Sequence, residues 1–447
     1  MASDPVIILG GGFAGLSCAA ALAEKGVPVA VIEKKPHLGG RAFSFKDTET
    51  GSIVDNGQHL FMGCYRETRA FLARIGASSR LRFFDKIRVD FADARGARDV
   101  LRCPAALGAP WHLAFGVLGL KGLTLGDKAG LWRLHRSLSQ IKRAGGAFEE
   151  LDRVTVRQWL GSLGQSRRIQ SRLFDPIALG VLNEDPAIAS ALGFAQCLLE
   201  IFFRDVESSR LGLSAVGLSE LYTGLARAFI EERGGKVLTS KKVSAIIEEQ
   251  GKVVGVVCES GERISAEAVV STLPPWDLKK MVRPAGLLGG WQRLEAAPIV
   301  SVALWLDRKV IAEPLVGMLG TDTHWVFNKS LILNEAAGGG QYLSLVISGA
   351  HRHIGLPPEA LVQGAQRDLA RCFPEFQKAT ITKWKVVKEP FATLSPAPGS
   401  DSLRPLPGLA MPGFYFAGDW TKTGLPATIE SAVVSGHRVA GAIVNGR

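Results

Sequence analysis

The chain has 447 residues, 47% of them hydrophobic and 21% charged, with a formal net charge of +11. This composition excludes a disordered chain, and the length favours two intertwined folded domains. The basic excess is uneven, because the segment 104–172 holds 11 Lys and Arg residues against four Asp and Glu. Such a face either attracts anionic lipid or is simply solvated, and we expect no nucleic-acid partner.

Cysteine usage and the N-terminus indicate an intracellular chain without a spanning segment. The cysteines show no C-x-x-C pair and several lie in apolar runs, which predicts buried free thiols. They stand at positions 18, 64, 103, 197, 258 and 372. No basic region followed by an apolar run opens the chain, so we expect no signal peptide. The weakly charged stretch 103–120 contains Pro104 and Pro110, which argue against a membrane-spanning helix.

The first 33 residues have the pattern of a βαβ unit. A β-branched apolar strand over 6–9 ends in glycines, a helix is expected over 14–25, and 28–33 is a second strand that ends in Glu33. Gly10, Gly12 and Gly15 form the spacing G-x-G-x-x-G in the turn between strand and helix. That spacing allows a tight turn, close approach of a pyrophosphate and close helix packing, while Glu33 can accept from ribose hydroxyls. This context predicts dinucleotide binding.

The later elements follow from periodicity and from turn residues. Helices are expected over 67–75, 128–143, 155–163, 190–203, 219–233, 357–372 and 427–445. Strands are expected over 236–238, 243–248, 253–259, 268–271, 299–306, 342–348 and 414–419. Residues 86–100 show no clear period, and 395–408 is a connector rich in Pro, Ser and Gly.

Three stretches together resemble the FAD-dependent amine oxidases and carotenoid desaturases. Glu33 is followed by Gly39-Gly40-Arg41, as in the family's E-x-x-x-x-x-G-G-R element. Near the C-terminus, Phe416-Ala417-Gly418-Asp419 resembles F-A-G-D, and 428–436 resembles the closing M-E-G-A-V-x-S-G stretch. The resemblance implies that the cofactor is FAD and that both ends of the chain touch it. The cofactor-binding residues it implies are Gly10, Gly12, Phe13, Ala14, Gly15, Glu33, Lys34, Gly40, Arg41, Gly57, His59, Val243, Gly418, Asp419 and Ile429.

Two departures separate the chain from amine oxidases. Thr428 stands where those enzymes usually place a Tyr of their aromatic cage, and no Cys follows Cys372 to make a flavin thioether, so FAD should be non-covalent. By contrast, Val54-Asp55-Asn56-Gly57-Gln58-His59, the run 63–68 and the run 418–430 resemble the squalene-associated desaturase-like flavoproteins, the hydroxysqualene dehydroxylases of hopanoid synthesis.

This resemblance implies reductive removal of the hydroxyl of hydroxysqualene, giving squalene, by hydride from N5 of reduced FAD. It further implies an electron donor that reduces the flavin. Two alternatives stay open: a phytoene-type desaturase that runs hydride in the opposite direction, and a non-catalytic FAD-bound carrier of isoprenoids. Amine oxidation is a more distant one. His59 is the first candidate for a proton donor, although it could equally be a structural histidine under the cofactor. Tyr65, Asp175 and Asn183 are weaker candidates.

The expected fold is α/β: a Rossmann-type FAD-binding domain interleaved with a mixed-sheet substrate domain and a helical membrane-facing region. The FAD-binding domain is expected over 1–75, 216–290 and 406–447, the substrate domain over 76–110 and 291–405, and the helical lid over 111–215. In that lid, an apolar run precedes Lys- and Arg-rich helices, which is typical of a docking surface on a bilayer. The run comprises Trp111, Leu113, Phe115, Val117 and Leu118.

We therefore expect a cytoplasmic protein, peripheral on the inner face of the cell membrane, with a polyisoprenoid substrate; an ordinary helical lid with exposed charge is the alternative for this region. His351 and His353 have no acid or Cys partner at ligand spacing, so we expect them at the surface and no metal in the protein.

Overall fold

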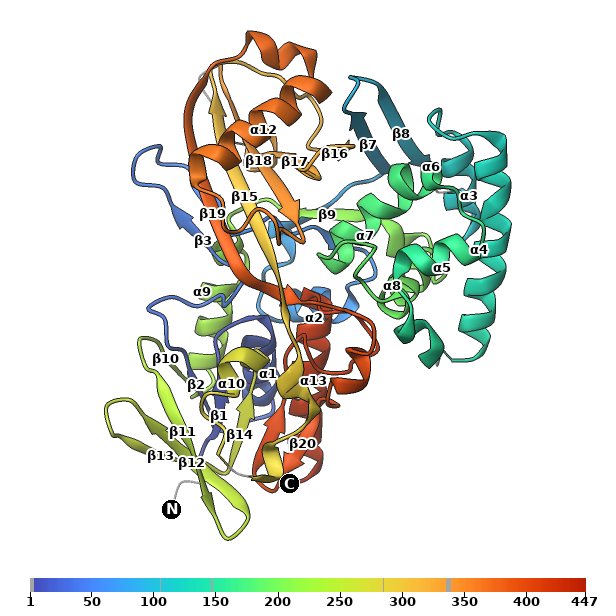
Figure 1. The fold of residues 1–447 in the computed structure, drawn as a ribbon. Coiled ribbons are helices and arrows are strands. Elements are labelled where there is room, and N and C mark those ends of the chain that lie inside the picture. The colour runs from blue at the N-terminus through green and yellow to red at the C-terminus, as the bar shows by residue number, and fades with distance from the viewer. Residues whose placement is uncertain (1–3, 105, 146–147, 284, 335–338) are drawn as a thin grey trace.

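The computed structural model describes residues 4–104, 106–145, 148–283, 285–334 and 339–447, and its first body is a Rossmann-type layer. Its six-stranded sheet has the order β10-β2-β1-β14-β21-β20 (Figure 1). All neighbours in it pair in parallel except β20 and β21. In sheet order the strands are Lys236–Leu238, Val29–Ile32, Val6–Leu9, Ala268–Ser271, Phe414–Phe416 and Gly408–Met411. Strands far apart in sequence thus end at one edge of the sheet.

Different layers cover the two faces of this sheet. Successive side chains of β1 point to opposite faces, and both sets are apolar, so both faces must be covered. Val6 and Ile8 pack in the core formed with helices α1 (Phe13–Glu24), α9 (Leu218–Glu231), α2 (Arg66–Arg74) and α13 (Ile429–Asn445). Ile7 and Leu9 pack instead in a core that includes the antiparallel sheet β11 (Val243–Glu249), β12 (Lys252–Cys258) and β13 (Arg263–Ser265). Both faces of β1 are therefore buried.

A second, seven-stranded sheet has the order β19-β15-β18-β17-β16-β7-β8, and only β16 and β7 pair in parallel. In that order the strands are Ile381–Leu394, Ala296–Leu306, Gln341–Ser348, Trp325–Asn328, Leu315–Leu319, Ile87–Asp93 and Arg98–Cys103. Helix α12 (Pro358–Cys372) packs on one face of this sheet through a shared apolar core. The long strands β15 and β19 run from this sheet down to the Rossmann-type body (Figure 1).

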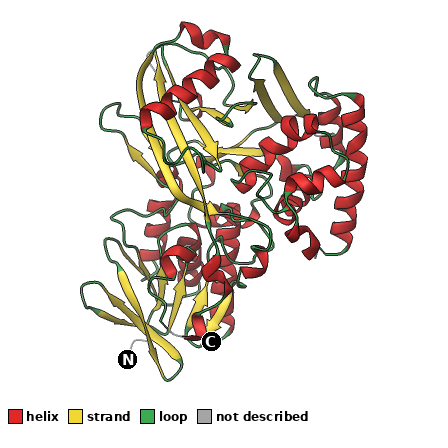
Figure 2. Cartoon of the chain, viewed as in Figure 1, coloured by secondary structure: helices red, strands yellow, loops and turns green. Residues whose placement is uncertain are grey.

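A helical part lies beside the mixed sheet (Figure 2). It comprises α3 (Trp111–Leu118), α4 (Leu125–Arg143), α5 (Val156–Ser162), α6 (Arg167–Ile169), α7 (Asp175–Leu182) and α8 (Ala191–Phe202). Hydroxyl side chains set its helix starts: Thr124 forms a capping box with Asp127, and Thr155 forms one with Gln158. Among the described residues, no helix is long and apolar enough to cross a membrane.

Short strands connect these bodies. They form a hairpin of β3 (Ser44–Lys46) and β4 (Ile53–Asp55), and a three-stranded sheet of β5 (Phe61–Met62), β9 (Leu211–Ser214) and β6 (Leu81–Phe83). The short helices α10 (Pro275–Leu278) and α11 (Lys329–Ile332) follow strands of the two large sheets.

The mixed α/β fold is confirmed, but several strands of the mixed sheet were not predicted. No element was predicted over 86–100, where no clear period is present, and β7 and β8 form a hairpin there. The 14-residue strand β19 was also missed; it is an edge strand that pairs only with β15. Its side chains are mostly half-exposed, so no period-two alternation of apolar residues marks it. All six cysteines are free and buried, as expected.

A candidate dinucleotide-binding site

The turn between β1 and α1 has the geometry that its glycines predict. Gly10 has φ +106°, a conformation that L side chains rarely adopt. A Cβ on Gly15 would lie 1.9 Å from the Gly10 carbonyl oxygen, so only glycine lets the helix pack this close to the strand. Gly12 is the N-cap of α1 and has no side chain to cap it. The first N–H groups of α1, at Phe13 and Ala14, therefore remain available to an anion.

Glu33 follows β2 and lies at the same sheet edge as this turn. Its carboxylate is buried, and it accepts from the backbone N–H of Gly11 at 2.8 Å and of Lys35 at 2.9 Å. These two bonds fix the carboxylate while leaving it further lone pairs. It can thus accept from ribose hydroxyls of a dinucleotide seated on α1.

The loop that carries Gly40 and Arg41 folds back onto the α1 turn. Gly39 N donates to Gly11 O at 2.8 Å, and a Cβ on Gly40 would lie 3.2 Å from Gly12 Cα. Tyr222 of α9 fixes this loop, because its hydroxyl lies 3.0 Å from Gly39 O. The Tyr222 ring also stacks on Phe13, with ring centroids 3.8 Å apart. Phe13 thereby contributes packing to the site as well as a backbone N–H.

Arg41 joins this cradle to the C-terminal element. Its guanidinium donates to Asp419 Oδ1 at 2.6 Å and to Ala392 O at 3.1 Å, and it lies over the ring of Trp276. Asp419 follows β21 and Gly418, whose φ of +121° again favours glycine. The N-terminal and C-terminal elements that suggested FAD are therefore in direct contact, through two residues that are 378 positions apart. Arg41 and Asp419 can together hold a pyrophosphate and the polyol next to it.

A buried arginine fixes the loop after Asp419. Arg404 donates to the carbonyl oxygens of Asp419, Trp420, Thr421 and Leu425. This loop leads into α13, whose first residue is Ile429 and whose N-cap is Thr428. The positive end of the α13 dipole consequently faces the same region as Asp419. No local pattern marked Arg404, because its partners are 15 to 21 residues away in sequence.

The segment with Gly57 and His59 follows β4. Asn56 donates to Arg41 O at 2.7 Å, which holds this segment against the glycine loop. Gly57 is buried, yet a Cβ on it would meet nothing within 4 Å, so open space lies on that side. Burial lowers the pKa of His59 to about 4, so its imidazole is neutral near pH 7. A neutral imidazole is suited to hydrogen bonding beside a cofactor rather than to proton delivery.

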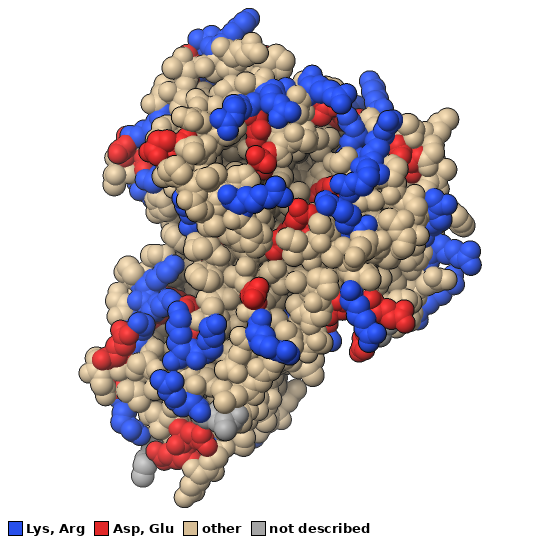
Figure 3. All heavy atoms as spheres, in the orientation of Figure 1, with Lys and Arg blue, Asp and Glu red and all other residues tan. Residues whose placement is uncertain are grey.

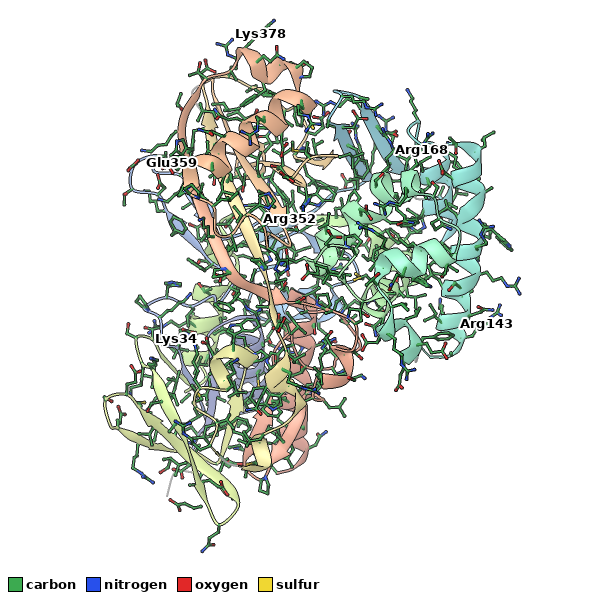
Figure 4. The ribbon with its side chains drawn as sticks, viewed as in Figure 1. Lys34, Arg143, Arg168, Arg352, Glu359 and Lys378 are labelled. Atoms are coloured by element: carbon green, nitrogen blue, oxygen red, sulfur yellow. The ribbon has the colours of Figure 1, made fainter. Side chains whose placement is uncertain are left out.

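Two predicted residues lie at the margin of the site. Val243 begins β11 and is buried in the core that contains Leu9 and Ile32, directly beneath the sheet edge. The side chain of Lys34, labelled in Figure 4, is partly exposed. It pairs with Asp277 of α10 at 2.8 Å.

The weaker catalytic candidates lie on two elements: Tyr65 is the N-cap of α2, whereas Asp175 and Asn183 lie at the two ends of α7. Burial raises the pKa of Tyr65 well above its usual value, and the hydroxyl interacts with Thr428. Asn183 ends α7 in the left-handed conformation and joins that helix to Thr393 at 2.9 Å and to Gly349 N at 3.0 Å. Asp175 begins α7, and its Oδ1 is buried without a hydrogen-bond partner among the described residues.

The two histidines expected as plain surface residues have acid partners. His351 Nε2 lies 3.0 Å from both carboxylate oxygens of Glu184, which is fully buried, and His353 lies 3.5 Å from Asp322. His351 is exposed, as expected, and no spacing in the sequence could reveal these acids, because they come from distant segments. Within the described ranges, no group of three or more His, Cys, Asp or Glu could hold a metal ion.

The glycine cradle, the buried Glu33 and the Arg41–Asp419 pair fit FAD, and they define a dinucleotide-dependent oxidoreductase of Rossmann type. The family model "Flavin containing amine oxidoreductase" matches residues 13–444, and the chain belongs to that family. FAD is its cofactor, and the chain is an FAD-dependent oxidoreductase.

Individual relatives cover the whole chain. It is 29% identical to a hydroxysqualene dehydroxylase of Rhodopseudomonas palustris, over 98% of each chain. It is 26% identical to a 15-cis-phytoene desaturase of Solanum lycopersicum, over 98% of this chain and 77% of that protein. Among solved structures, wild-type putrescine oxidase bound to putrescine superposes with a TM-score of 0.75 and 17% identity, over 99% of each chain. That last similarity concerns the fold alone.

Proposed function

We propose that the protein removes the hydroxyl group of hydroxysqualene reductively, giving squalene. The observation that carries this proposal is the end-to-end similarity to a hydroxysqualene dehydroxylase, which spans 98% of both chains. The phytoene desaturase of similar identity is matched over only 77% of its length. Thr428, at the cap of α13, replaces the cage Tyr usual in amine oxidases and argues against an amine substrate.

In this reaction the C–O bond breaks, a C–H bond forms and the oxygen leaves as water. Bound reduced FAD supplies the hydride and ends oxidised, while the departing hydroxyl needs a proton. We assign that proton to Asp175. Burial raises the pKa of Asp175 more than the charges of Arg157 and Arg167 lower it. Its Oδ1 is buried without a hydrogen-bond partner among the described residues, which leaves it a bond to make with a bound substrate, and helix α7 lies where the helical part meets the mixed sheet (Figure 1).

The polyisoprenoid substrate would enter from a membrane, and α3 and α4 offer a docking surface. We define the docking patch as four exposed apolar side chains: Trp111, Phe115, Leu118 and Trp132. Each is more than half exposed, with Trp132 at 64%. Val117 is only 1% exposed and Leu113 packs against the core, so of the expected run only one side faces outward.

Basic residues accompany the docking patch on α4. Lys and Arg side chains project along the edge that this helix forms (Figure 3), and Arg143 lies at its end (Figure 4). Aromatic side chains next to cations are the composition of an interfacial surface on anionic lipid. We therefore propose peripheral attachment to the inner face of the cell membrane.

The deciding experiment is anaerobic. The purified holoenzyme is photoreduced, and hydroxysqualene is added without oxygen. Return of the oxidised flavin absorption together with squalene in the extract would support the proposal. Flavin that stays reduced, with the alcohol recovered intact, would refute it. Oxidised enzyme with phytoene is the parallel test for the desaturase alternative, which the similarity to the tomato enzyme favours.

A further inference from the structure

A buried ion pair lies next to the segment that carries His59. Lys329 Nζ is 2.7 Å from Asp55 Oδ2, and the two side chains are only 3% and 4% exposed. Lys329 begins α11 of the mixed-sheet part, whereas Asp55 ends β4 at the Rossmann-type body. Taking both charges out of water is costly, so a pair at this depth needs close geometry and further hydrogen bonds to be stable.

The carboxylate of Asp55 is fully engaged by its neighbours. Oδ1 accepts from Leu218 N at 3.0 Å, and Oδ2 accepts from Lys329 and from Gln58 Nε2 at 3.2 Å. Lys329 also reaches Gln58 Oε1 at 3.3 Å. The segment 55–58 is consequently fixed from the mixed-sheet side, immediately before His59.

Two charged groups act on His59. Asp55, on its own segment, favours the imidazolium, and Arg41, on the facing glycine loop, opposes it. Each has a counter-charge behind it, because Asp55 is paired with Lys329 and Arg41 with Asp419. Removing Lys329 alone would leave the Asp55 carboxylate uncompensated beside the imidazole.

We propose that Lys329 is a positioning residue: it anchors the segment 55–59 from the mixed-sheet side and balances the Asp55 charge, so that His59 remains a neutral imidazole beside the cofactor. The inference concerns the protein's own residues and holds for any isoprenoid substrate. It explains why a lysine is buried at this junction, since a neutral residue could fill the space but not cancel the charge.

The test is a proton titration of His59 in the holoenzyme, followed by NMR with histidine labelled with ¹³C at Cε1. His59→Gln assigns the signal by its loss. In the wild type the His59 signal should stay constant between about pH 5.5 and 8.5. In Lys329→Met it should titrate within that range, since the unbalanced Asp55 carboxylate should raise the His59 pKa from about 4 by roughly two units or more.

Two matched variants separate charge from structure. Asp55→Asn combined with Lys329→Met removes both charges, and Lys329→Arg keeps the positive charge; the His59 signal should stay constant in both. If Lys329→Met folds poorly, Lys329→Gln replaces it, because its amide can still donate to Asp55 without carrying a charge. A signal that stays constant in Lys329→Met, or that titrates equally in the double variant, would overturn the proposal.

The flavin provides a second readout without substrate. The visible absorption bands of bound FAD in Lys329→Met should shift with the same midpoint as the His59 signal, because His59 lies beside the cofactor. Bands that stay constant while the imidazole titrates would overturn that placement. Neither measurement involves hydroxysqualene, so a failure here is distinguishable from a failure of the dehydroxylase proposal.

Discussion

The guanidinium of Arg41 donates to Asp419 Oδ1 at 2.6 Å and thereby joins two loops separated by 378 residues. The contact connects the glycine loop at the N-terminal end of the chain with the element that leads into α13. Both partners are partly buried, at 29% and 10% side-chain exposure. An ion pair in this setting holds the two loops of the cofactor cradle together.

Replacing Arg41 should weaken FAD binding. Arg41→Met removes a charge-assisted bond to Asp419 and the cation that we expect beside the pyrophosphate, so the Kd for FAD should rise at least about tenfold. Quenching of flavin fluorescence on titrating the apoprotein measures this. Arg227→Met is the matched control, because Arg227 forms an exposed pair with Glu231 and should leave Kd unchanged. An equal effect of both variants would contradict the role of Arg41.

The third glycine of the turn should tolerate no side chain. Gly15→Ala places Cβ 1.9 Å from Gly10 O, and we expect a loss of about 1–3 kcal/mol in unfolding free energy together with weaker FAD binding. Gly161→Ala, in α5, is the control, because its Cβ meets nothing within 4 Å. That substitution should stabilise the protein by up to about 1 kcal/mol. Denaturant unfolding followed by circular dichroism compares them.

Lys329→Met should be among the most destabilising single substitutions. It leaves the buried Asp55 carboxylate unpaired, which costs about 3–5 kcal/mol of unfolding free energy. Adding Asp55→Asn to it should restore part of that loss, since no uncompensated charge remains. Urea unfolding of the wild type, Lys329→Met and the double variant at one pH compares their unfolding free energies. A double variant no more stable than Lys329→Met would show that packing, not charge, dominates.

Asp175 should govern the high-pH limb of the reductive reaction. Its raised pKa keeps the acid form present to higher pH, so the rate of flavin reoxidation by substrate should fall as pH rises through that value. In Asp175→Asn the rate should fall at least about 100-fold, and the pH-dependent limb should disappear. Stopped-flow flavin absorbance under anaerobic conditions measures both, with the Kd for FAD as the check that the cradle is intact.

The docking patch should control attachment to vesicles. Trp111→Ala combined with Trp132→Ala removes two exposed aromatic side chains, and co-sedimentation with anionic phospholipid vesicles should fall several-fold. Leu406→Ala combined with Leu409→Ala removes exposed leucines elsewhere and should leave binding unchanged. Binding that survives in the tryptophan variant would place the attachment surface on another face.

The fold class and the cofactor were predictable from sequence, because the signals that carry them are local. The turn at Gly10–Gly15 needs glycines for steric reasons that hold wherever it occurs, and Glu33 follows from the same βαβ unit. The mixed sheet was harder to predict. β19 is a half-exposed edge strand, whereas β7 pairs with both β8 and β16 and its residues 90–93 are all buried, so neither strand shows an alternation of apolar and polar residues.

The βαβ unit, the FAD family and the order of its motifs could all be predicted from the amino-acid sequence. The contacts between distant side chains could not, and the fold showed them: Arg41 with Asp419, Tyr222 with the glycine loop, and Lys329 with Asp55. It also showed that burial leaves His59 neutral, that Val117 faces inward and that His351 has a buried acid partner. The difference lies in how far along the chain each kind of interaction acts. Steric limits act between neighbours in the chain, whereas burial and charge pairing depend on segments that only folding brings together.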